Sequence, residues 1–196
     1  IRCPSVTPTD EGAQAVVAAV LERAGFAIHH VERAGVKNLW ASIGETGPLL
    51  CFAGHTDVVP TGAPDAWRSP PFEPVVRDGM LYGRGTSDMK GGIGCFLAAI
   101  ERFLDGRRAP RGFRLGVLIA GDEEDTINRG TVDVLEYLRS RGEHIDYCIV
   151  AEPTSSEATG DTIKNGRRGS VTGFLTVEGI QGHSAYPQLA RNPVHQ

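Results

Sequence analysis

The sequence predicts an α/β protein that contains a mostly parallel sheet with helices on both faces, followed by the beginning of a second domain. Two observations indicate the sheet. Short apolar segments typical of buried strands alternate with amphipathic helical patterns, and clusters of polar residues follow several of the strands. A third observation indicates the second domain, because the alternation stops near Gly169 and a new strand pattern starts there.

The charge balance excludes several classes of protein. The chain has 196 residues, with 20 Lys and Arg against 24 Asp and Glu, a formal net charge of −4 and a pI near 5.9. This balance argues against a nucleic-acid-binding protein, which needs a basic surface. The longest apolar runs are far too short to cross a membrane. No positively charged and then apolar leader opens the sequence, so we expect a cytoplasmic protein with no membrane partner.

The first part of the chain predicts one helix and three strands. Apolar residues recur on one face over residues 10–24, where Thr9 is the expected N-cap and Gly25 the stop. The strand patterns that follow cover residues 26–31, 38–43 and 49–54. Residues 58–76 hold five of the twelve prolines and are expected to form a long functional loop.

The alternation of strands and helices then continues. The patterns predict strands at residues 80–82, 113–120 and 147–150 and helices at residues 90–104 and 131–140. A further strand pattern at residues 171–177 opens the second domain. We therefore expect a first domain of residues 1–168 and the start of a second domain at residues 169–196.

The cysteine usage indicates a reducing compartment. No two of the four cysteines form the closely spaced pair of a zinc knuckle or a redox motif. Cys51, Cys95 and Cys148 lie in apolar segments. We expect all three to be buried free thiols that pack as small hydrophobic side chains.

Acidic and imidazole side chains follow four successive strand patterns: His55 and Asp57, Asp88, Glu123 and Glu124, and Glu152. Ligands of α/β sheets collect at the carboxyl ends of the strands, so these side chains can converge on one edge. One histidine with several carboxylates is a mixed nitrogen and oxygen set that suits zinc or another divalent ion. The sequence therefore predicts a metal centre.

The local spacings give these residues different roles. His55 and Asp57 are two residues apart, so one can bind metal while the other holds the imidazole in place. Glu123 and Glu124 are adjacent, so one can coordinate metal while its neighbour carries a proton. The glycine-rich segment at residues 83–92 lacks the full dinucleotide and P-loop patterns. It fits a turn that presents Asp88 beside a helix N-terminus.

Four segments together carry a resemblance to a known group of enzymes: Gly54-His-Thr-Asp-Val-Val-Pro, Gly83-Arg-Gly-Thr-Ser-Asp-Met-Lys-Gly-Gly, Asp122-Glu-Glu and Ala151-Glu-Pro. With these segments the chain resembles the dinuclear zinc peptidases and amidohydrolases of the aminoacylase/carboxypeptidase clan, peptidase family M20. Within that clan it is most similar to the desuccinylases. The narrower resemblance rests on Asn165-Gly-Arg-Arg-Gly-Ser, on residues 182–195 and on the opening Ile-Arg-Cys-Pro-Ser-Val-Thr-Pro.

The resemblance implies a hydrolase that splits N-succinyl-LL-2,6-diaminopimelate into succinate and LL-2,6-diaminopimelate in lysine biosynthesis. It implies a homodimer, and it identifies the second domain as an α+β dimerisation or lid domain that follows a catalytic domain. It also implies two Zn²⁺ per complete active site, for which Co²⁺ can substitute. His55, Asp88 and Glu152 would hold one ion, and Asp88 and Glu124 would contribute to the other.

The resemblance also implies the catalytic residues. Glu123 would be the general base, Asp57 would orient His55, and His183 would reach into the site of the partner subunit. A cis peptide bond is expected between Asp88 and Met89. The substrate carboxylates would be bound by Arg167, Arg168 and Ser170, since a guanidinium fork suits a carboxylate.

Two departures from the family leave other interpretations open. Asp125 stands where the family has glycine, and the family's last metal-binding histidine would lie beyond Gln196. We therefore expect one complete zinc site here and two carboxylates of the other. The alternatives are an acetylornithine deacetylase or other aminoacylase of the clan, a metal-binding but inactive fragment that needs its missing C-terminal half, and a purely structural α/β module.

Overall fold

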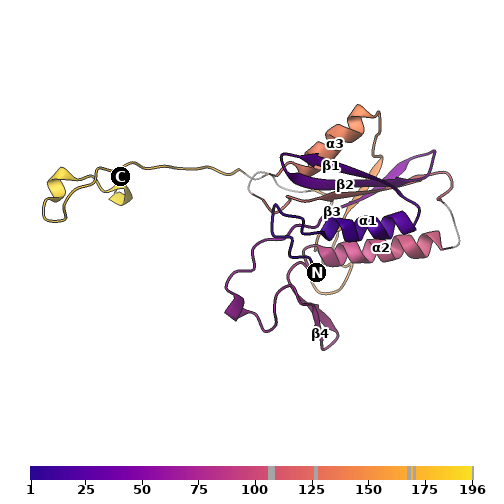
Figure 1. The fold of residues 1–196 in the computed structure, drawn as a ribbon, viewed down its shortest axis with the longest axis horizontal. Coiled ribbons are helices and arrows are strands. Elements are labelled where there is room, and N and C mark those ends of the chain that lie inside the picture. Colours follow the sequence, from indigo (N-terminus) through magenta and orange to yellow (C-terminus); the bar gives the residue numbers. More distant parts are fainter. Residues whose placement is uncertain (106–108, 126–127, 167–168, 170, 196) are drawn as a thin grey trace. The chain divides into compact units, whose positions relative to one another are not determined.

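The computed structural model describes residues 1–105, 109–125, 128–166, 169 and 171–195 (Figure 1). The chain forms two compact units, Ile1–Pro153 and Thr154–Gln196. The expected domain boundary between residues 168 and 169 stays a prediction.

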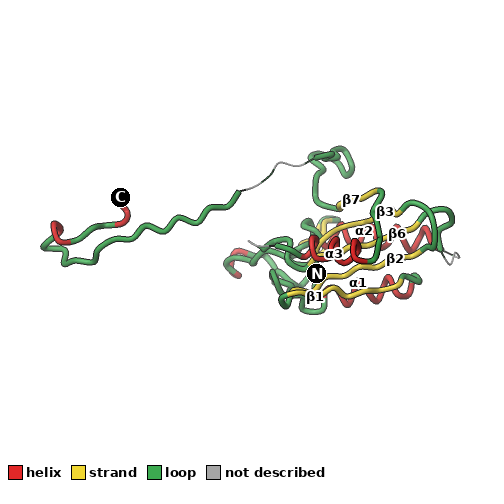
Figure 2. Tube along the Cα trace, turned by 90° about the horizontal axis from the view of Figure 1, so that it is seen from above, coloured by secondary structure: helices red, strands yellow, loops and turns green. Residues whose placement is uncertain are grey.

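The first unit is built on a five-stranded sheet with the strand order β1-β2-β6-β3-β7 (Figure 2). Its strands are β1 (Ala27–Arg33), β2 (Val36–Ile43), β3 (Leu49–His55), β6 (Arg114–Ala120) and β7 (Tyr147–Val150). The neighbours β6, β3 and β7 pair in parallel, whereas β2 pairs antiparallel with both β1 and β6. Within the described residues, four strands of this sheet therefore point the same way and β2 alone opposes them.

Three helices cover the two faces of the sheet (Figure 1). The helices α1 (Ala13–Arg23) and α2 (Lys90–Leu104) pack on one face, where Leu21, Phe96 and Ile100 are buried against strand residues. Helix α3 (Gly130–Ser140) packs on the other face through Val134 and Leu138. The predicted α/β class, with a three-layer arrangement, is confirmed.

The predicted helix over residues 90–104 and the strands over residues 80–82 and 147–150 are confirmed with the same bounds. Strands β1 and β2 extend further towards each other than the pattern predicts. Only Ala34 and Gly35 separate them, both at positive φ, which suits the tight turn of a two-residue hairpin.

The predicted N-cap of the first helix is wrong. The helix begins three residues later than expected, after Gly12, and the side chain of Asp10 accepts the N–H groups of Gly12 and Gln14. The hydroxyl of Thr9 donates instead to the carbonyl of Val6. The carboxylate offers two acceptor oxygens to this turn, which the threonine hydroxyl cannot do.

The proline-rich segment at residues 58–76 is mostly irregular, as predicted. It contains a short 3₁₀ helix, Pro64–Ala66, and runs into strand β4 (Val75–Arg77), which sequence reasoning missed. Strand β4 forms a two-stranded hairpin with β5 (Met80–Tyr82), and its three residues are too few to show a period.

Two predictions of burial and structure are wrong. Cys51 is buried, but Cys95 and Cys148 are exposed. Cys95 lies off the core-facing side of α2. Cys148 lies on β7, which pairs only with β3 among the described residues and whose four residues are all exposed. The strand expected at residues 171–177 does not form, because this segment pairs with no other strand in the part of the chain that the structure describes.

The second unit contains the 3₁₀ helices Pro187–Leu189 and Pro193–His195 and an isolated bridge between Ile180 and Arg191. A loop ahead of them is organised by Asp161, whose carboxylate accepts the N–H groups of Ser156, Glu157 and Ala158. No described helix has the length and hydropathy that crossing a membrane requires.

Candidate metal centre

Six predicted site residues lie close together at one edge of the sheet, five of them because they end or follow strands that are parallel neighbours. His55 is the last residue of β3 and pairs in register with Ala120, the last residue of β6. Strand β7 lies on the other side of β3 and ends two residues before Glu152. The turn after β6 carries Glu123 and Glu124, Asp57 follows β3, and Asp88 precedes α2. The expected convergence is therefore observed for the ends of β3, β6 and β7. It is wrong for the strand before Asp88, because β5 (Met80–Tyr82) pairs with β4 in a separate antiparallel hairpin and Asp88 reaches the cluster from the segment before α2.

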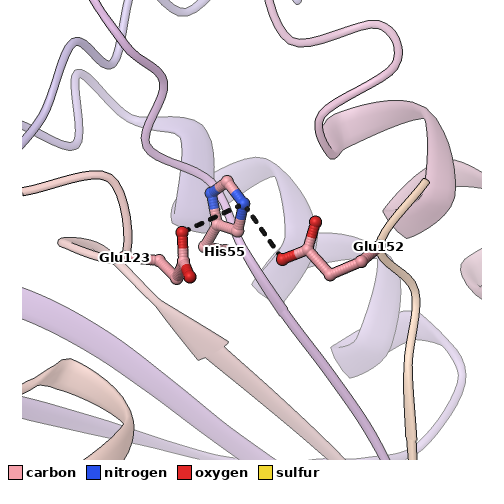
Figure 3. Close-up of side chains that lie close together, drawn as sticks. All are labelled: His55, Glu123 and Glu152. Carbon is pink, nitrogen blue, oxygen red and sulfur yellow. Dashed lines mark ion pairs between the residues drawn. The ribbon is translucent and has the colours of Figure 1, made fainter. Parts of the chain in front are cut away.

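The Nε2 atom of His55 is the centre of the cluster. It lies 3.0 Å from Oδ1 of Asp88, 3.6 Å from Oε1 of Glu152 and 3.9 Å from Oε2 of Glu123. Figure 3 shows the imidazole between the carboxylates of Glu123 and Glu152. The ring is only 1% exposed, whereas the Asp88 and Glu123 carboxylates are partly open to solvent.

The candidate ligand atoms form two overlapping groups, and within each group all of them lie within 4.8 Å of one another. One group is His55, Glu123 and Glu152, and the other is His55, Asp88 and Glu124. An imidazole nitrogen with several carboxylate oxygens is a donor set that fits zinc or another divalent cation. Glu123, the expected general base, belongs to one of these groups together with expected ligands. The division of roles among these carboxylates therefore stays a prediction.

The orientation of His55 is fixed from its other nitrogen. Nδ1 lies 2.9 Å from the backbone carbonyl oxygen of Asp57 and 3.5 Å from its Oδ1 atom. The N–H at Nδ1 donates to this carbonyl, so Nε2 is the ring nitrogen that faces the carboxylates. A metal-binding histidine is usually held by its other ring nitrogen in this way. The sequence predicts this contact for the Asp57 side chain, but the backbone makes the shorter one.

The carboxylate of Asp57 holds the turn that follows β6. Its Oδ1 accepts the N–H of Glu123 at 3.1 Å, and its Oδ2 accepts the N–H of Glu124 at 3.0 Å. Asp57 is 1% exposed, so these hydrogen bonds are shielded from water. One buried residue thereby positions both glutamates and the histidine.

The first acid of the Asp122-Glu-Glu motif has a different function. Asp122 is buried, and its two oxygens accept the N–H groups of Arg129 and Gly130 at 2.8 Å each, where α3 begins. Asp122 thus holds the residues at the start of α3, whereas Asp57 holds the backbone of the two glutamates. Sequence reasoning assigned roles only to the two glutamates of this motif.

Burial and the neighbouring charged groups shift the pKa values of the cluster residues. Burial lowers the pKa of His55, but hydrogen bonds to Asp57 and Glu152 outweigh burial and raise that pKa to about 11. Burial is the largest cause that raises the pKa of Glu123 and Glu124, and neighbouring carboxylates add to it. Burial raises the pKa of Asp57 too, yet hydrogen bonds from His55 and the Glu124 N–H lower it overall. The negative charge gathered here favours a bound cation.

Sequence reasoning missed the contribution of Met89 and Gly54. The expected cis peptide between Asp88 and Met89 is present, and the Met89 side chain is fully buried. Its sulfur lies 3.3 Å from the backbone nitrogen of His55. An added Cβ at Gly54 would come within 2.6 Å of the Met89 terminal methyl, so a side chain at this position would force the Met89 side chain to shift. The pair packs the Asp88 turn against the end of β3.

The N-terminal segment supports the same region. The Ser5 hydroxyl donates to the carbonyl of Thr56 at 2.6 Å, and Ser5 is fully buried. Backbone hydrogen bonds join Val58 to Ser5 and Thr7. The sequence identifies this opening segment only as part of a family resemblance. In the structure its hydrogen bonds hold residues 56–58 in place.

The structure does not test the remaining predicted site residues. His183 lies in the second unit, where its Nδ1 accepts the N–H of Ala185 and its ring lies 5.8 Å from that of Tyr186. Arg167, Arg168 and Ser170 lie outside the described residues. The roles of these four residues stay predictions.

Residues 51–194 match peptidase family M20/M25/M40. The whole chain is 57% identical to a succinyl-diaminopimelate desuccinylase of Janthinobacterium sp. (strain Marseille) and 56% identical to one of Herminiimonas arsenicoxydans. In each case the match covers 100% of this chain and 52% of the relative. The chain therefore spans about half the length of these curated relatives.

Two solved structures share the fold. Human carnosine dipeptidase 1 is 27% identical with a TM-score of 0.58, over 70% of this chain and 31% of that protein. The M20 family metallo-carboxypeptidase Sso-CP2 from Sulfolobus solfataricus is 24% identical with a TM-score of 0.62, over 79% of this chain and 35% of that protein. The first unit therefore has the catalytic-domain fold of metal-dependent peptidases.

Proposed function

Because this chain belongs to peptidase family M20/M25/M40, we propose that it forms the metal-binding part of a bacterial amide hydrolase. The proposed reaction is the hydrolysis of N-succinyl-LL-2,6-diaminopimelate to succinate and LL-2,6-diaminopimelate. The observation that carries this proposal is the convergence of four carboxylates on buried His55, in a chain 57% identical to a desuccinylase.

The proposed metal ligands follow from the cluster. His55, Asp88 and Glu152 hold one zinc ion, and Asp88 and Glu124 contribute to a second. Cobalt is the proposed substitute, because the same nitrogen and oxygen donors suit both ions. When bound, such ions lower the pKa of a water molecule towards neutrality and polarise the amide carbonyl.

Glu123 is the proposed general base. Its carboxylate faces the cluster and is partly open to solvent, so it can reach both a water molecule and a substrate. Its raised pKa, caused mainly by burial, suits a group that accepts a proton and returns it to the departing amine. Asp57 is the proposed positioning residue, since it holds the N–H groups of both glutamates and orients His55.

The second unit supplies the proposed substrate contacts. Arg167, Arg168 and Ser170 bind the substrate carboxylates, and His183 stabilises the oxyanion in the site of a partner subunit. This assignment makes the working enzyme a homodimer. The proposed location is the bacterial cytoplasm, because the biosynthesis of diaminopimelate and lysine takes place there.

Paired substrates test the proposal. The chain is joined to the part of the Janthinobacterium relative that it does not match, loaded with zinc, and assayed with N-succinyl-LL-2,6-diaminopimelate and with N-acetylornithine. We expect the succinyl substrate to be preferred. Glu123→Gln should lower kcat by about 10²–10⁴-fold, while the exposed control Glu45→Gln leaves it unchanged. A preference for N-acetylornithine, or an active Glu123→Gln variant, would overturn the proposal.

A further inference from the structure

The proline-rich loop connects two parts of the metal centre. It begins at Val58, directly after Asp57, and the chain then runs through the hairpin of β4 and β5 to the segment that carries Asp88. Figure 1 shows this stretch leaving the sheet after β3 and returning at the start of α2. The contact between His55 and Asp88 therefore requires that the two ends of this stretch stay together.

Arg84 joins the two ends of the stretch. Its Nη2 atom donates to the carbonyl oxygen of Pro60 at 3.1 Å, across 24 residues of sequence. Its backbone N–H donates to the carbonyl oxygen of Pro71 at 2.7 Å. One residue thereby binds the proline-rich loop at two points, near its beginning and in its second half.

The guanidinium of Arg84 also lies over an aromatic ring of the same loop. Its Cζ atom is 5.3 Å from the centre of the Trp67 ring, within the distance of about 6 Å over which a cation and an aromatic face attract each other. The indole N–H of Trp67 donates to the carbonyl oxygen of Thr61 at 2.9 Å. This hydrogen bond fixes the ring beside the part of the loop that Arg84 binds.

The segment after Arg84 is held closely up to Asp88 and beyond. The N–H of Lys90 donates to the carbonyl of Gly85 at 2.9 Å, which closes a turn around Asp88. Gly85 has a φ of +80°, and an added Cβ there would lie 2.8 Å from a methyl carbon of Val58. The position of Arg84 is therefore passed on to Asp88 through a short, hydrogen-bonded segment.

We propose that Arg84 is a positioning residue that fixes the proline-rich loop and so holds the Asp88 turn against the end of β3. This inference deepens the proposed function and rests on the metal centre described above. A guanidinium suits the position because it combines planar N–H donors with a flat cation that stacks on an aromatic ring. Without Arg84, a looser Asp88 turn adds an ordering cost to metal binding.

Zinc affinity is the first test. Titration against a competing chelator compares the unaltered chain with Arg84→Met, which keeps the apolar stem but has neither charge nor N–H donor. We expect the zinc dissociation constant to rise by about tenfold, the lower end of the range for groups that support metal ligands. Arg84→Lys keeps the charge and one donor for the Pro60 carbonyl, so its affinity should lie between the two.

Arg77→Met is the matched control. Arg77 also lies over an aromatic ring, with its Cζ atom 4.4 Å from the centre of the Tyr82 ring, but both residues belong to the hairpin of β4 and β5. This substitution removes the same chemical groups from a contact inside the hairpin, so zinc affinity should not change.

Trp67→Leu tests the other side of the contact and keeps the test informative even where Arg84→Met does not fold. It removes the ring beneath the guanidinium and should weaken zinc binding in the same direction. The effects of Trp67→Leu and Arg84→Met should not add in the double variant, because both substitutions break the same contact.

Amide hydrogen exchange of the zinc-free chain separates this inference from the proposed function. In Arg84→Met, the N–H groups of residue 84 and Lys90 should exchange at least about tenfold faster, because local opening of the turn no longer breaks the Arg84 side-chain contacts. Arg77→Met should leave both exchange rates unchanged. Circular dichroism confirms that each variant is folded.

The outcomes are distinct. A chain that binds zinc but does not hydrolyse the succinyl substrate would overturn the proposed reaction and leave this inference standing. An Arg84→Met variant that matches Arg77→Met, either in zinc affinity or in amide exchange, would overturn the positioning role of Arg84.

Discussion

The Nε2 atom of His55 lies 3.0 Å from the Oδ1 atom of Asp88, although 33 residues separate them in the sequence. This contact joins the end of β3 to the turn before α2 and brings two chemically different donors to one point. The other carboxylates arrive from the strands on either side of β3. The metal centre therefore combines residues from three strand ends and from the turn before α2, and no single motif contains it.

Replacement of Asp57 should loosen the centre without removing a proposed ligand. In Asp57→Asn one carboxylate oxygen becomes an N–H₂ group, which faces a backbone N–H of Glu123 or Glu124. We expect a loss of about 1–3 kcal/mol in the free energy of unfolding and a fall of about 10–100-fold in zinc affinity. Chemical denaturation and zinc titration measure these two effects.

Asp65→Asn is the control for this substitution, because Asp65 is an exposed residue of the proline-rich loop. It should change neither quantity. An Asp57→Asn variant that matches this control in both measurements would contradict the positioning role of Asp57.

Truncation of Met89 should affect both stability and the metal site. The side chain is fully buried beneath His55, so Met89→Ala leaves a cavity and should cost about 2–5 kcal/mol in the free energy of unfolding. The Asp88 turn loses its packing against β3, and zinc affinity should fall with it.

The matched control is Met80→Ala, since Met80 is 62% exposed on the β4–β5 hairpin. We expect it to change the free energy of unfolding by less than about 0.5 kcal/mol. Equal effects of the two substitutions would show that Met89 does not support the end of β3.

The Asp161 loop should respond to pH in a defined direction. The N–H groups of Ala158, Glu157 and Ser156 lower the pKa of Asp161 below its ordinary value. A lowered pKa in the folded state means that this carboxylate stabilises the loop above the unfolded pKa of about 3.9. That contribution is lost only as the pH falls through the lower folded pKa.

Amide NMR spectra recorded across the acidic range measure this loss. The resonances of residues 156–158 should keep their folded positions through pH 3.9 and change only below it. A midpoint at or above that value, or no change in these resonances in Asp161→Asn at pH 7, would contradict the assignment.

The sequence predicts the parts of this structure that depend on local patterns. Helix α2 follows from its apolar period, and the position of His55 follows from the end of a buried strand pattern. The convergence of Glu124 and Glu152 on His55 follows from the general rule for parallel sheets, and the observed cluster agrees with it. Asp88 reaches the cluster by another route, because the strand before it, β5, pairs with β4 in a separate antiparallel hairpin.

Long-range contacts set the features that the sequence does not reveal. The bonds from Asp57 to the N–H groups of Glu123 and Glu124 cross more than 60 residues. The contact between Met89 and His55 depends on how α2 packs against one face of the sheet. Cys148 is exposed where its apolar neighbours predict burial, because β7 pairs only with β3 among the described residues.

Zinc stoichiometry tests the central claim most directly. The purified chain is stripped with a chelator, reloaded with zinc, freed of excess metal and analysed for bound zinc, beside His55→Ala and the exposed control His144→Ala. We predict at least one tightly bound zinc in the unaltered chain and in the control, and none in His55→Ala. A folded chain that binds no zinc, or a His55→Ala variant that binds as much as the control, would contradict the metal centre.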